Sequence, residues 1–235
     1  MFDSLLMLSD GEPHTAAMNM AIDEALLESA EISSIRFYRW DSPALSFGYF
    51  GKYADVANFA AQCDVVRRWT GGGIVFHGDD LTYSIVIPAG DPLFNESTKR
   101  IYEKIHHAIQ RALGTTGQHA ELATATTLNA QARNLSGGEH SPHIGGAGYC
   151  FASAVQADLL LNGRKIAGAA QRRTRRGLLQ QGSIQGVYLG NDLPERFARE
   201  LSQLCREELL SSNIFERARE IAQNKYANET WLRKR

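Results

Sequence analysis

Apolar residues recur with helical spacing in two long segments of the chain. In residues 15–30 they return every fourth position, alanine is frequent, and Thr15 can cap the first turn. The apolar positions there are Met18, Ile22 and Leu26. In residues 96–113 one face carries Ile101, Ile105, Ala108, Ile109 and Ala112. The spacing predicts a helix in each segment.

Two further helices are predicted near the end of the sequence. Residues 194–210 begin with Pro194, a residue favoured at helix starts, and the apolar face carries Phe197, Leu201 and Leu204. The last helix is predicted from about residue 213 to 226. A short helix is also predicted over residues 53–63.

Runs rich in β-branched and aromatic residues predict the strands. IRFYRW and ALSFGYF are separated by Asp41-Ser42-Pro43 and are interpreted as two strands around a turn. VVRRW and GIVFH flank three glycines, and TYSIVIP follows them. Asn162-Gly163, between AVQADLLL and RKIAGAAQRR, is a strong hairpin signal, and LLQQGSIQGVYL follows as a third strand.

The order of these elements is typical of an α+β fold. Helices and strands do not alternate regularly, so we expect a mixed, largely antiparallel sheet, or sheets, flanked by helices. We expect residues 1–235 to form a single domain with a short helical portion from about residue 191. Residues 114–148 show little periodicity, and a loop of that length is usually functional or mobile.

Composition narrows the classes of function. The 235 residues carry a formal net charge of −1, so a large electrostatic surface for nucleic acid is not expected. No apolar run approaches the ~18 residues of a membrane span, and the start of the chain lacks a signal-peptide pattern. Three cysteines without a CxxC pair indicate free thiols and a cytoplasmic protein.

The stretch RRWTGGGIVFH, residues 67–77, is the first candidate for chemistry. It matches neither the GxGxxG fingerprint nor a P-loop. Three glycines are compatible with a flexible turn, or with a loop whose bare backbone approaches a polar ligand. Arg68 and His77 on either side favour the second interpretation.

Cys150 and Lys165 are the next candidates. Cys63 and Cys205 lie in predicted helices beside apolar residues and are expected to pack. Cys150 ends the glycine-rich GGAGYCF, where it is either a small buried residue or a nucleophile, which would need a nearby positive charge. Lys165 is either a solvated hairpin lysine or a residue that reaches a ligand lying against the small residues after it. Five histidines show no metal-binding pattern and are expected to face solvent: 106, 107, 119, 140 and 143.

Several motifs in the same order resemble the lipoate–protein ligase and octanoyltransferase family, which shares its fold with biotin–protein ligases. They are NMAIDEALL, RFYRW, LSFGYF, RRWTGGGIVFH, GRKIAGAAQRR, QQGSI and NKYANETW. The resemblance implies that Lys165 is the essential lysine. It implies an acyl pocket lined by Arg68, Gly71, Gly72, Gly73, His77, Gly168 and Ala169, with Tyr38 and Tyr49 in its apolar wall.

The family contains two chemistries. Ligases activate free lipoate with ATP and Mg²⁺ and then acylate a lysine of a lipoyl domain. Octanoyltransferases take octanoate from acyl carrier protein, one type of them through a cysteine thioester. Cys150, followed by Phe151 and fifteen positions before Lys165, resembles that nucleophile, and LTYS at 81–84 also resembles the transferases.

Other residues favour the ligases or depart from both types. The unbroken TGGGIVFH resembles the ligase loop. Gly78 replaces an aspartate usual in both branches, and Gln181 stands where a histidine usually precedes the Gly-Ser pair. A non-catalytic module that binds lipoyl or acyl-carrier proteins is therefore a third hypothesis, whereas the distal motifs argue against a biotin ligase.

The sequence thus predicts a cofactor-free octanoyltransferase, with Cys150 and Lys165 as its catalytic residues. Its partners would be acyl carrier protein and a lipoyl-domain protein, either a glycine-cleavage H protein or a 2-oxoacid dehydrogenase E2 subunit. We expect a monomer, with neither a metal site nor a nucleic-acid or membrane partner. The ATP-dependent ligase is the alternative.

Overall fold

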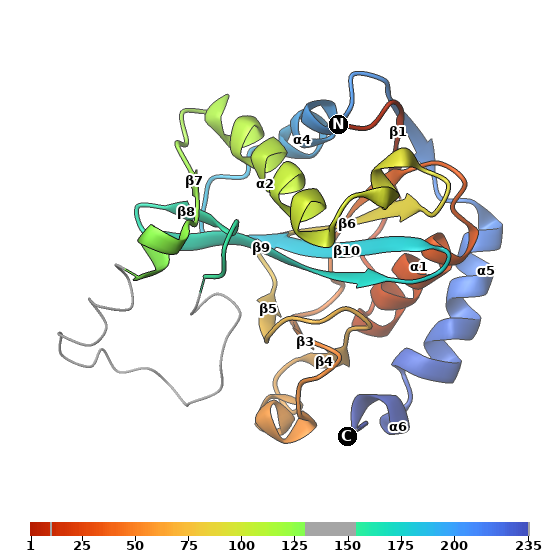
Figure 1. The fold of residues 1–235 in the computed structure, drawn as a ribbon. Helices are drawn as coiled ribbons and strands as arrows, with labels where there is room; N and C mark the ends of the chain where they lie inside the picture. Colours follow the sequence, from red (N-terminus) through yellow and green to blue (C-terminus); the bar gives the residue numbers. More distant parts are fainter. Residues whose placement is uncertain (10, 130–153, 235) are drawn as a thin grey trace, which may run out of the picture.

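The protein is built around one large mixed sheet with helices on both faces and a smaller sheet beside it (Figure 1). The computed structural model describes residues 1–9, 11–129 and 154–234. Across the large sheet the strands are β11 (Cys205–Leu209), β1 (Leu5–Ser9), β2 (Ser34–Tyr38), β6 (Leu81–Pro88), β10 (Gly177–Ile184), β9 (Arg164–Arg173), β8 (Leu159–Leu161) and β7 (Glu121–Leu122).

Only β11, β1 and β2 run parallel to one another in this sheet, and the remaining neighbours are antiparallel. The predicted α+β class with a largely antiparallel sheet is confirmed. The predicted hairpin between β8 and β9 is also confirmed. Asn162 and Gly163 have φ of +52° and +76°, and a type I′ turn requires positive φ at both residues.

The smaller sheet places β3 (Ala44–Phe47) between β4 (Asp64–Arg67) and β5 (Val75–His77). β4 is parallel to β3 and β5 is antiparallel to it. The three glycines therefore connect strands that lie on opposite sides of β3 and do not form a hairpin turn. β2 and β3 lie in different sheets rather than around one turn, because each pairs with strands from later in the chain.

Helices cover both faces of the large sheet, as Figure 1 shows. α2 (Thr98–Gly114) and α4 (Leu193–Leu201) pack on one face, against the side chains of Ile85 and Ile87. α1 (Ala16–Ser29) and α5 (Ser212–Ile221) pack on the other face, against Val86. A π-helical turn (Ala222–Tyr226) and α6 (Glu229–Leu232) follow α5.

The two long predicted helices are confirmed. Thr15 caps α1 by accepting a hydrogen bond from the Met18 backbone N–H at 3.2 Å. The predicted apolar face of α2 is buried along its whole length. The segment predicted as a short helix at 53–63 instead forms two 3₁₀ turns, η1 (Tyr53–Asp55) and η2 (Ala57–Phe59); a third, η3 (Pro92–Asn95), precedes α2.

Two predictions near the end of the chain and on α2 are wrong. The helix predicted at 194–210 ends at Leu201, and residues 205–209 form edge strand β11, because pairing with β1 satisfies their backbone groups. Cys205 therefore packs on a strand, although it does border the core as expected. His106 is fully buried against the Tyr102 ring instead of facing solvent.

No helix in the described ranges combines the length and the apolar character needed to cross a bilayer.

Candidate active site

A cavity of about 400 Å³, which includes the space at its mouth, lies between the two sheets and α1. Its lining is mainly apolar. Several residues predicted for the acyl pocket line it: Tyr38, Arg68, Gly72, His77, Gly168 and Ala169. They come from β2, from β5, from β9 and from the loop that joins β4 to β5 and carries the three glycines, which we call the glycine loop. The fold thus brings together residues separated by up to about half of the chain.

Arg68 organises the glycine loop from inside. One guanidinium nitrogen donates to the carbonyl oxygens of Gly71 at 3.0 Å and Gly73 at 2.8 Å. The other donates to Ser46 Oγ at 2.6 Å. The guanidinium charge is therefore committed to holding the loop and the Ser46 hydroxyl at the wall of the cavity.

The glycines permit a close contact within the protein itself. Gly72 has φ of +85°, a conformation that favours glycine. A Cβ on the neighbouring Gly48 would lie 2.1 Å from the Gly72 carbonyl oxygen, whereas a Cβ on Gly71 would meet nothing within 4 Å. Because Gly48 has no side chain, the glycine loop can pack directly against its backbone, and this contact positions Gly72 in the cavity wall.

His77 stands in a directed chain of hydrogen bonds. Because Ser46 Oγ accepts from Arg68, its own proton points to His77 Nε2, 2.6 Å away. His77 Nδ1–H then donates to Asp80 Oδ2 at 2.8 Å. Burial lowers the pKa of His77, with a further contribution from the Arg68 charge. The ring is thus neutral near pH 7, and it stacks on Trp40 at 4.1 Å between centroids.

Asp80 provides a buried carboxylate two positions after Gly78, the residue that replaces an aspartate usual in both branches of the family. It accepts from the Gly78 backbone N–H at 3.1 Å and from the hydroxyls of Thr82 and Ser183, each at 2.7 Å. Burial raises the pKa of Asp80, but the hydrogen bonds from His77, Ser183 and Thr82 outweigh it and leave the pKa below its usual value. Asp80 is therefore ionised and orients His77.

Gln181 belongs to a buried polar network at the base of the cavity. Its carbonyl oxygen accepts from Thr70 Oγ1 at 2.8 Å, and its amide donates to Asp23 Oδ2 at 2.7 Å. Asp23 also pairs with Arg36 at 3.0 Å, and both side chains are inaccessible to solvent. The amide suits this position because it donates to a carboxylate and accepts from a hydroxyl at the same time.

Lys165 is held in place rather than solvated. Its ammonium lies 2.7 Å from Asp158 Oδ2, and only 4% of its side chain is exposed. A Cβ on Gly168 would lie 2.6 Å from Lys165 Cε. The small residue therefore allows the lysine to fold over the strand at a position that lines the cavity.

A second group of residues fixes the carboxylate partner of Lys165. Asp158 accepts from Tyr102 Oη at 2.5 Å and from the Val155 backbone N–H at 2.7 Å. Tyr102 Oη in turn accepts from the Ala169 backbone N–H at 3.0 Å. The lysine, the carboxylate and the cavity strand are thus joined in one network.

Tyr49 is a residue predicted for the pocket wall that the fold does not bring to this cavity. It lies half-buried outside the cavity, where its hydroxyl accepts from Lys234 Nζ at 2.6 Å. Cys150 lies outside the described residues, so its role remains a prediction. Among the residues the structure describes, no three His, Cys, Asp or Glu side chains are grouped to hold a metal ion.

Sequence reasoning missed Ser46, Asp80, Asp158 and Tyr102. Spacing gives no signal for Ser46 and Tyr102, whose partners are distant in the sequence. Asp158 did carry a signal, since it is a carboxylate inside the apolar run AVQADLLL. A charge in a buried strand needs a partner, and Lys165 on the paired strand is that partner.

Known proteins resemble this chain in sequence over most of its length. The family model described as "Lipoyl protein ligase A/B catalytic domain" matches residues 15–191. Octanoyltransferase LipM of Oceanobacillus iheyensis is 38% identical over 184 residues, which are 74% of this chain and 62% of that protein. The LipM of Clostridioides difficile is 34% identical, over 73% of this chain and 62% of that protein. The chain thus spans less than two thirds of the length of these curated relatives.

Solved structures resemble it in fold. The putative lipoate protein ligase Ta0514 from T. acidophilum, with bound lipoic acid, superposes with a TM-score of 0.71 at 20% identity, covering 97% of this chain and 98% of that one. A lipoate-protein ligase A bound with ATP gives 0.70 at 21% identity, covering 99% and 98%. The two chains of each pair share an architecture from end to end. Together with the family match over residues 15–191, this shows that the chain belongs to the lipoyl protein ligase A/B catalytic domain family.

Proposed function

We propose that this protein transfers an octanoyl group from acyl carrier protein to a lysine of a lipoyl-domain protein. The observation that carries the proposal is the similarity to several proteins named octanoyltransferase LipM, at 34–38% identity. The cavity supports it, because an apolar lining with a lysine and a neutral histidine at its edge suits an acyl chain with a reactive carbonyl at one end.

The proposed reaction has two steps and needs no cofactor. The Cys150 thiolate attacks the octanoyl thioester of the carrier, the new S–C bond forms, and the phosphopantetheine thiolate leaves and takes up a proton. The amine of the acceptor lysine then attacks the enzyme thioester, loses a proton and forms the amide, and the Cys150 thiolate leaves. Lys165 would stabilise the oxyanion that develops in each step.

The network around Lys165 gives this role a physical basis. Asp158 fixes the direction of the ammonium at 2.7 Å, so no reorganisation is needed when charge develops on the carbonyl oxygen. Arg68, Gly72 and His77 would form the wall along the acyl chain, with Tyr38 and Ala169 as further contacts. Gly71 and Gly73 act through their carbonyl contacts with Arg68.

The ATP-dependent ligase is the second candidate, and one observation favours it. The unbroken glycine loop TGGGIVFH resembles that of the ligases. Both candidates take a lipoyl domain as acceptor; a bi-partite lipoate protein ligase from Thermoplasma acidophilum is described with its E2 lipoyl domain. The acceptor of this chain would be such an E2 domain or an H protein, docked on a monomer.

One assay separates the candidates. The protein is incubated with octanoyl-acyl carrier protein without ATP, and Cys150 is examined for an octanoyl adduct by mass spectrometry. The proposal predicts the adduct, its transfer to a lipoyl domain, and loss of both in Cys150→Ala. If wild type acylates the domain only from free lipoate with ATP and Mg²⁺, and Cys150→Ser retains full activity, the transferase assignment is wrong. Tight binding of either protein partner without acylation would favour a non-catalytic module.

A further inference from the structure

Beside the cavity, cationic side chains gather on a group of aromatic rings. The Arg172 guanidinium carbon lies 5.0 Å from the centroid of Trp69 and 5.3 Å from that of Tyr49. The Lys225 ammonium lies 4.4 Å from Trp69. Trp231 and Lys234 complete the group, with contacts to Lys225 and Tyr49. We call this set the cation–aromatic cluster: Tyr49, Trp69, Arg172, Lys225, Trp231 and Lys234.

The cluster holds more positive charge than its own partners neutralise. Lys225 pairs with Glu24 at 2.6 Å, and Lys234 donates to the Tyr49 hydroxyl. Among the described residues, the Arg172 guanidinium has neither a hydrogen-bond acceptor nor an ion-pair partner, and its Nε is buried. A guanidinium cannot shed its proton, and a buried donor without an acceptor is costly.

Neighbouring charges make the imbalance larger. Burial lowers the pKa of Lys225, and the nearby Arg172 charge lowers it further, against the opposing effect of Glu24. Both cations lie within about 5 Å of the same Trp69 ring. An anion placed between the two cations would accept hydrogen bonds from the Arg172 guanidinium and reduce the repulsion between Arg172 and Lys225.

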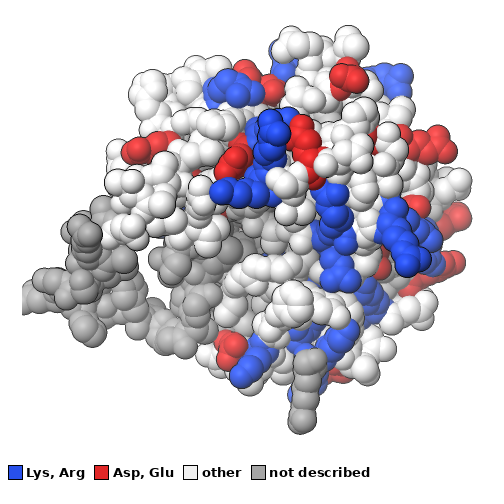
Figure 2. All heavy atoms as spheres, in the orientation of Figure 1, with Lys and Arg blue, Asp and Glu red and all other residues white. Residues whose placement is uncertain are grey.

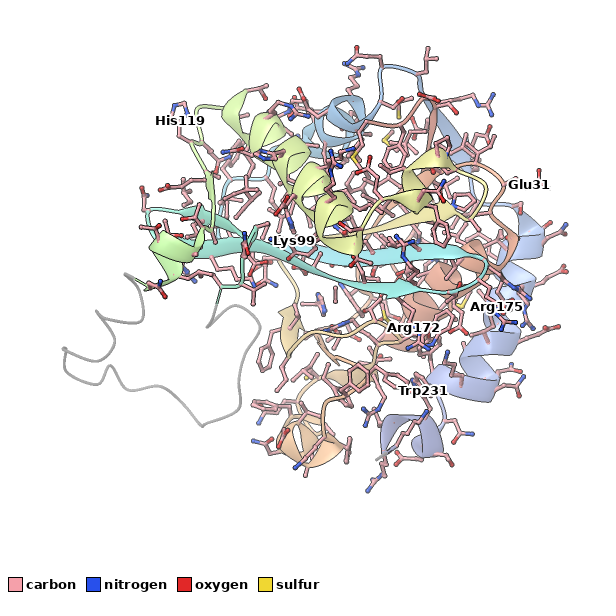
Figure 3. All side chains as sticks on the ribbon, in the orientation of Figure 1. Glu31, Lys99, His119, Arg172, Arg175 and Trp231 are labelled. Carbon is pink, nitrogen blue, oxygen red and sulfur yellow. The ribbon has the colours of Figure 1, made fainter. Side chains whose placement is uncertain are left out.

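The cluster adjoins the cavity at two places, through Arg172 on β9 and through Trp69 next to Arg68. Ala170 lines the cavity, and Arg172 is the next residue on the same face of β9, about 7 Å further along the strand. Trp69 directly follows Arg68 of the cavity wall. From Gly168, which Lys165 covers, to Arg172 the strand runs for about 13 Å. In Figure 3, Arg172 lies below the β9–β10 hairpin on the side of Trp231, while Arg175 lies near the turn.

The surface around the β9–β10 hairpin is also positively charged. Figure 2 shows Lys and Arg side chains following one another down this face of the molecule. Arg173 and Arg176 lie at or beside the hairpin turn. A negatively charged donor would therefore be attracted to this side of the cavity.

We propose that the cation–aromatic cluster binds the phosphate of the acyl donor, the phosphodiester at the far end of a phosphopantetheine arm. This assignment rests on the proposed octanoyltransferase function and extends it by naming where the arm is held. A planar guanidinium forms two parallel hydrogen bonds with a phosphate. The rings of Trp69 and Tyr49 hold Arg172 in place, so little side-chain entropy is lost on binding. The thioester end of the arm then reaches the cavity at Gly168 and Lys165.

The test compares donors that differ only in the phosphate. Octanoyl-pantetheine and octanoyl-4′-phosphopantetheine are used as substrates for wild type, Arg172→Gln and the control Arg175→Gln, which changes an exposed arginine of the same hairpin. Arg172→Gln is expected to lower kcat/KM about 10- to 100-fold for the phosphorylated donor, the range for hydrogen bonds to a charged group. It should leave the unphosphorylated donor unchanged, and Arg175→Gln should change neither.

Arg172→Lys, which keeps the charge without the planar fork, should fall between wild type and Arg172→Gln. An equal loss of kcat/KM on both donors would show that Arg172 supports the fold of the site rather than the phosphate, and would overturn the proposal. So would an unchanged kcat/KM on both.

Binding without reaction keeps this test separate from the proposed function. The affinities of phosphopantetheine, pantetheine and AMP are measured by calorimetry for wild type and Arg172→Gln. Tighter binding of phosphopantetheine than of pantetheine, lost in Arg172→Gln, supports the subsite even if no octanoyl transfer is observed. No difference between the two overturns it. An Arg172-dependent preference for AMP over phosphopantetheine would assign the cluster to an adenylate and refute the phosphopantetheine assignment.

Discussion

Asp158→Asn is the substitution that most directly tests the buried ion pair of Lys165. In the structure, Asp158 Oδ1 accepts from Tyr102, while Oδ2 accepts from both Lys165 and Val155. Asparagine keeps the shape but has one oxygen. If that oxygen stays on Tyr102, the amide nitrogen faces two donors and can accept from neither.

The burial of the pair sets the size of the effect. The side chain of Lys165 is 4% exposed and that of Asp158 is 0% exposed, so water would poorly replace the lost carboxylate at the ammonium. Removing one partner of a buried pair costs about 3–5 kcal/mol, whereas exposed pairs contribute about 1 kcal/mol or less. We therefore expect Asp158→Asn to lower the free energy of unfolding by about 3–5 kcal/mol.

Urea unfolding followed by tryptophan fluorescence measures this change. Lys165→Gln and the double variant complete a mutant cycle, and the double variant should lose clearly less stability than the sum of the two single variants. A loss below about 1 kcal/mol for Asp158→Asn, or additive losses, would refute the conclusion that the pair is desolvated and coupled. The acylation assay on the same proteins shows how far the direction of the ammonium matters for catalysis.

Three further predictions concern the glycine contact, a buried histidine and the proposed catalytic lysine. Gly48→Ala places a Cβ 2.1 Å from a backbone oxygen of the glycine loop and should cost about 1–3 kcal/mol in urea unfolding, whereas Gly71→Ala should be tolerated. Burial lowers the pKa of His106 to about 3, so between pH 6.5 and 3 the unfolded chain binds a proton that the folded chain does not. Stability should therefore fall as the pH is lowered, by up to about 1.4 kcal/mol per pH unit. Between pH 6.5 and 5, His106→Gln should reduce the dependence of the free energy of unfolding on pH, whereas substitution of the exposed His107 by Gln should not. The same dependence in wild type and His106→Gln would contradict the burial of His106. Lys165→Ala should slow octanoyl transfer about 10²–10³-fold, and a rate near that of wild type in a folded variant would exclude Lys165 from the oxyanion contact.

Local patterns predicted the elements that depend on local physics. The apolar face of α2 and the Asn162-Gly163 turn follow from spacing and backbone conformation alone, and both are confirmed. The helix predicted to continue past Leu201 failed for the opposite reason. Residues 205–209 form a strand only because β1, about 200 positions earlier, offers an edge with which they can pair.

The site shows the same division between local and distant information. The glycine loop, His77 and Lys165 were found because motifs mark them, and all of them lie at or against the cavity. Their partners Ser46 and Asp158 were not found, since each is defined by a contact across sheets or strands. Tyr49 was assigned to the acyl wall from its aromatic strand, but the chain beyond β3 carries it to the cation–aromatic cluster.

The polar network beneath the cavity limits how this pocket could be redesigned for other acyl groups. Asp23 accepts hydrogen bonds from Arg36, Tyr38 and Gln181, and Gln181 also accepts from Thr70. Shortening any one of these side chains to enlarge the pocket would leave a buried donor or acceptor unpaired. If the cavity binds the acyl chain as proposed, single substitutions in this network should not change the preferred chain length without loss of stability, and directed evolution toward longer chains should proceed through paired changes or through the apolar wall instead.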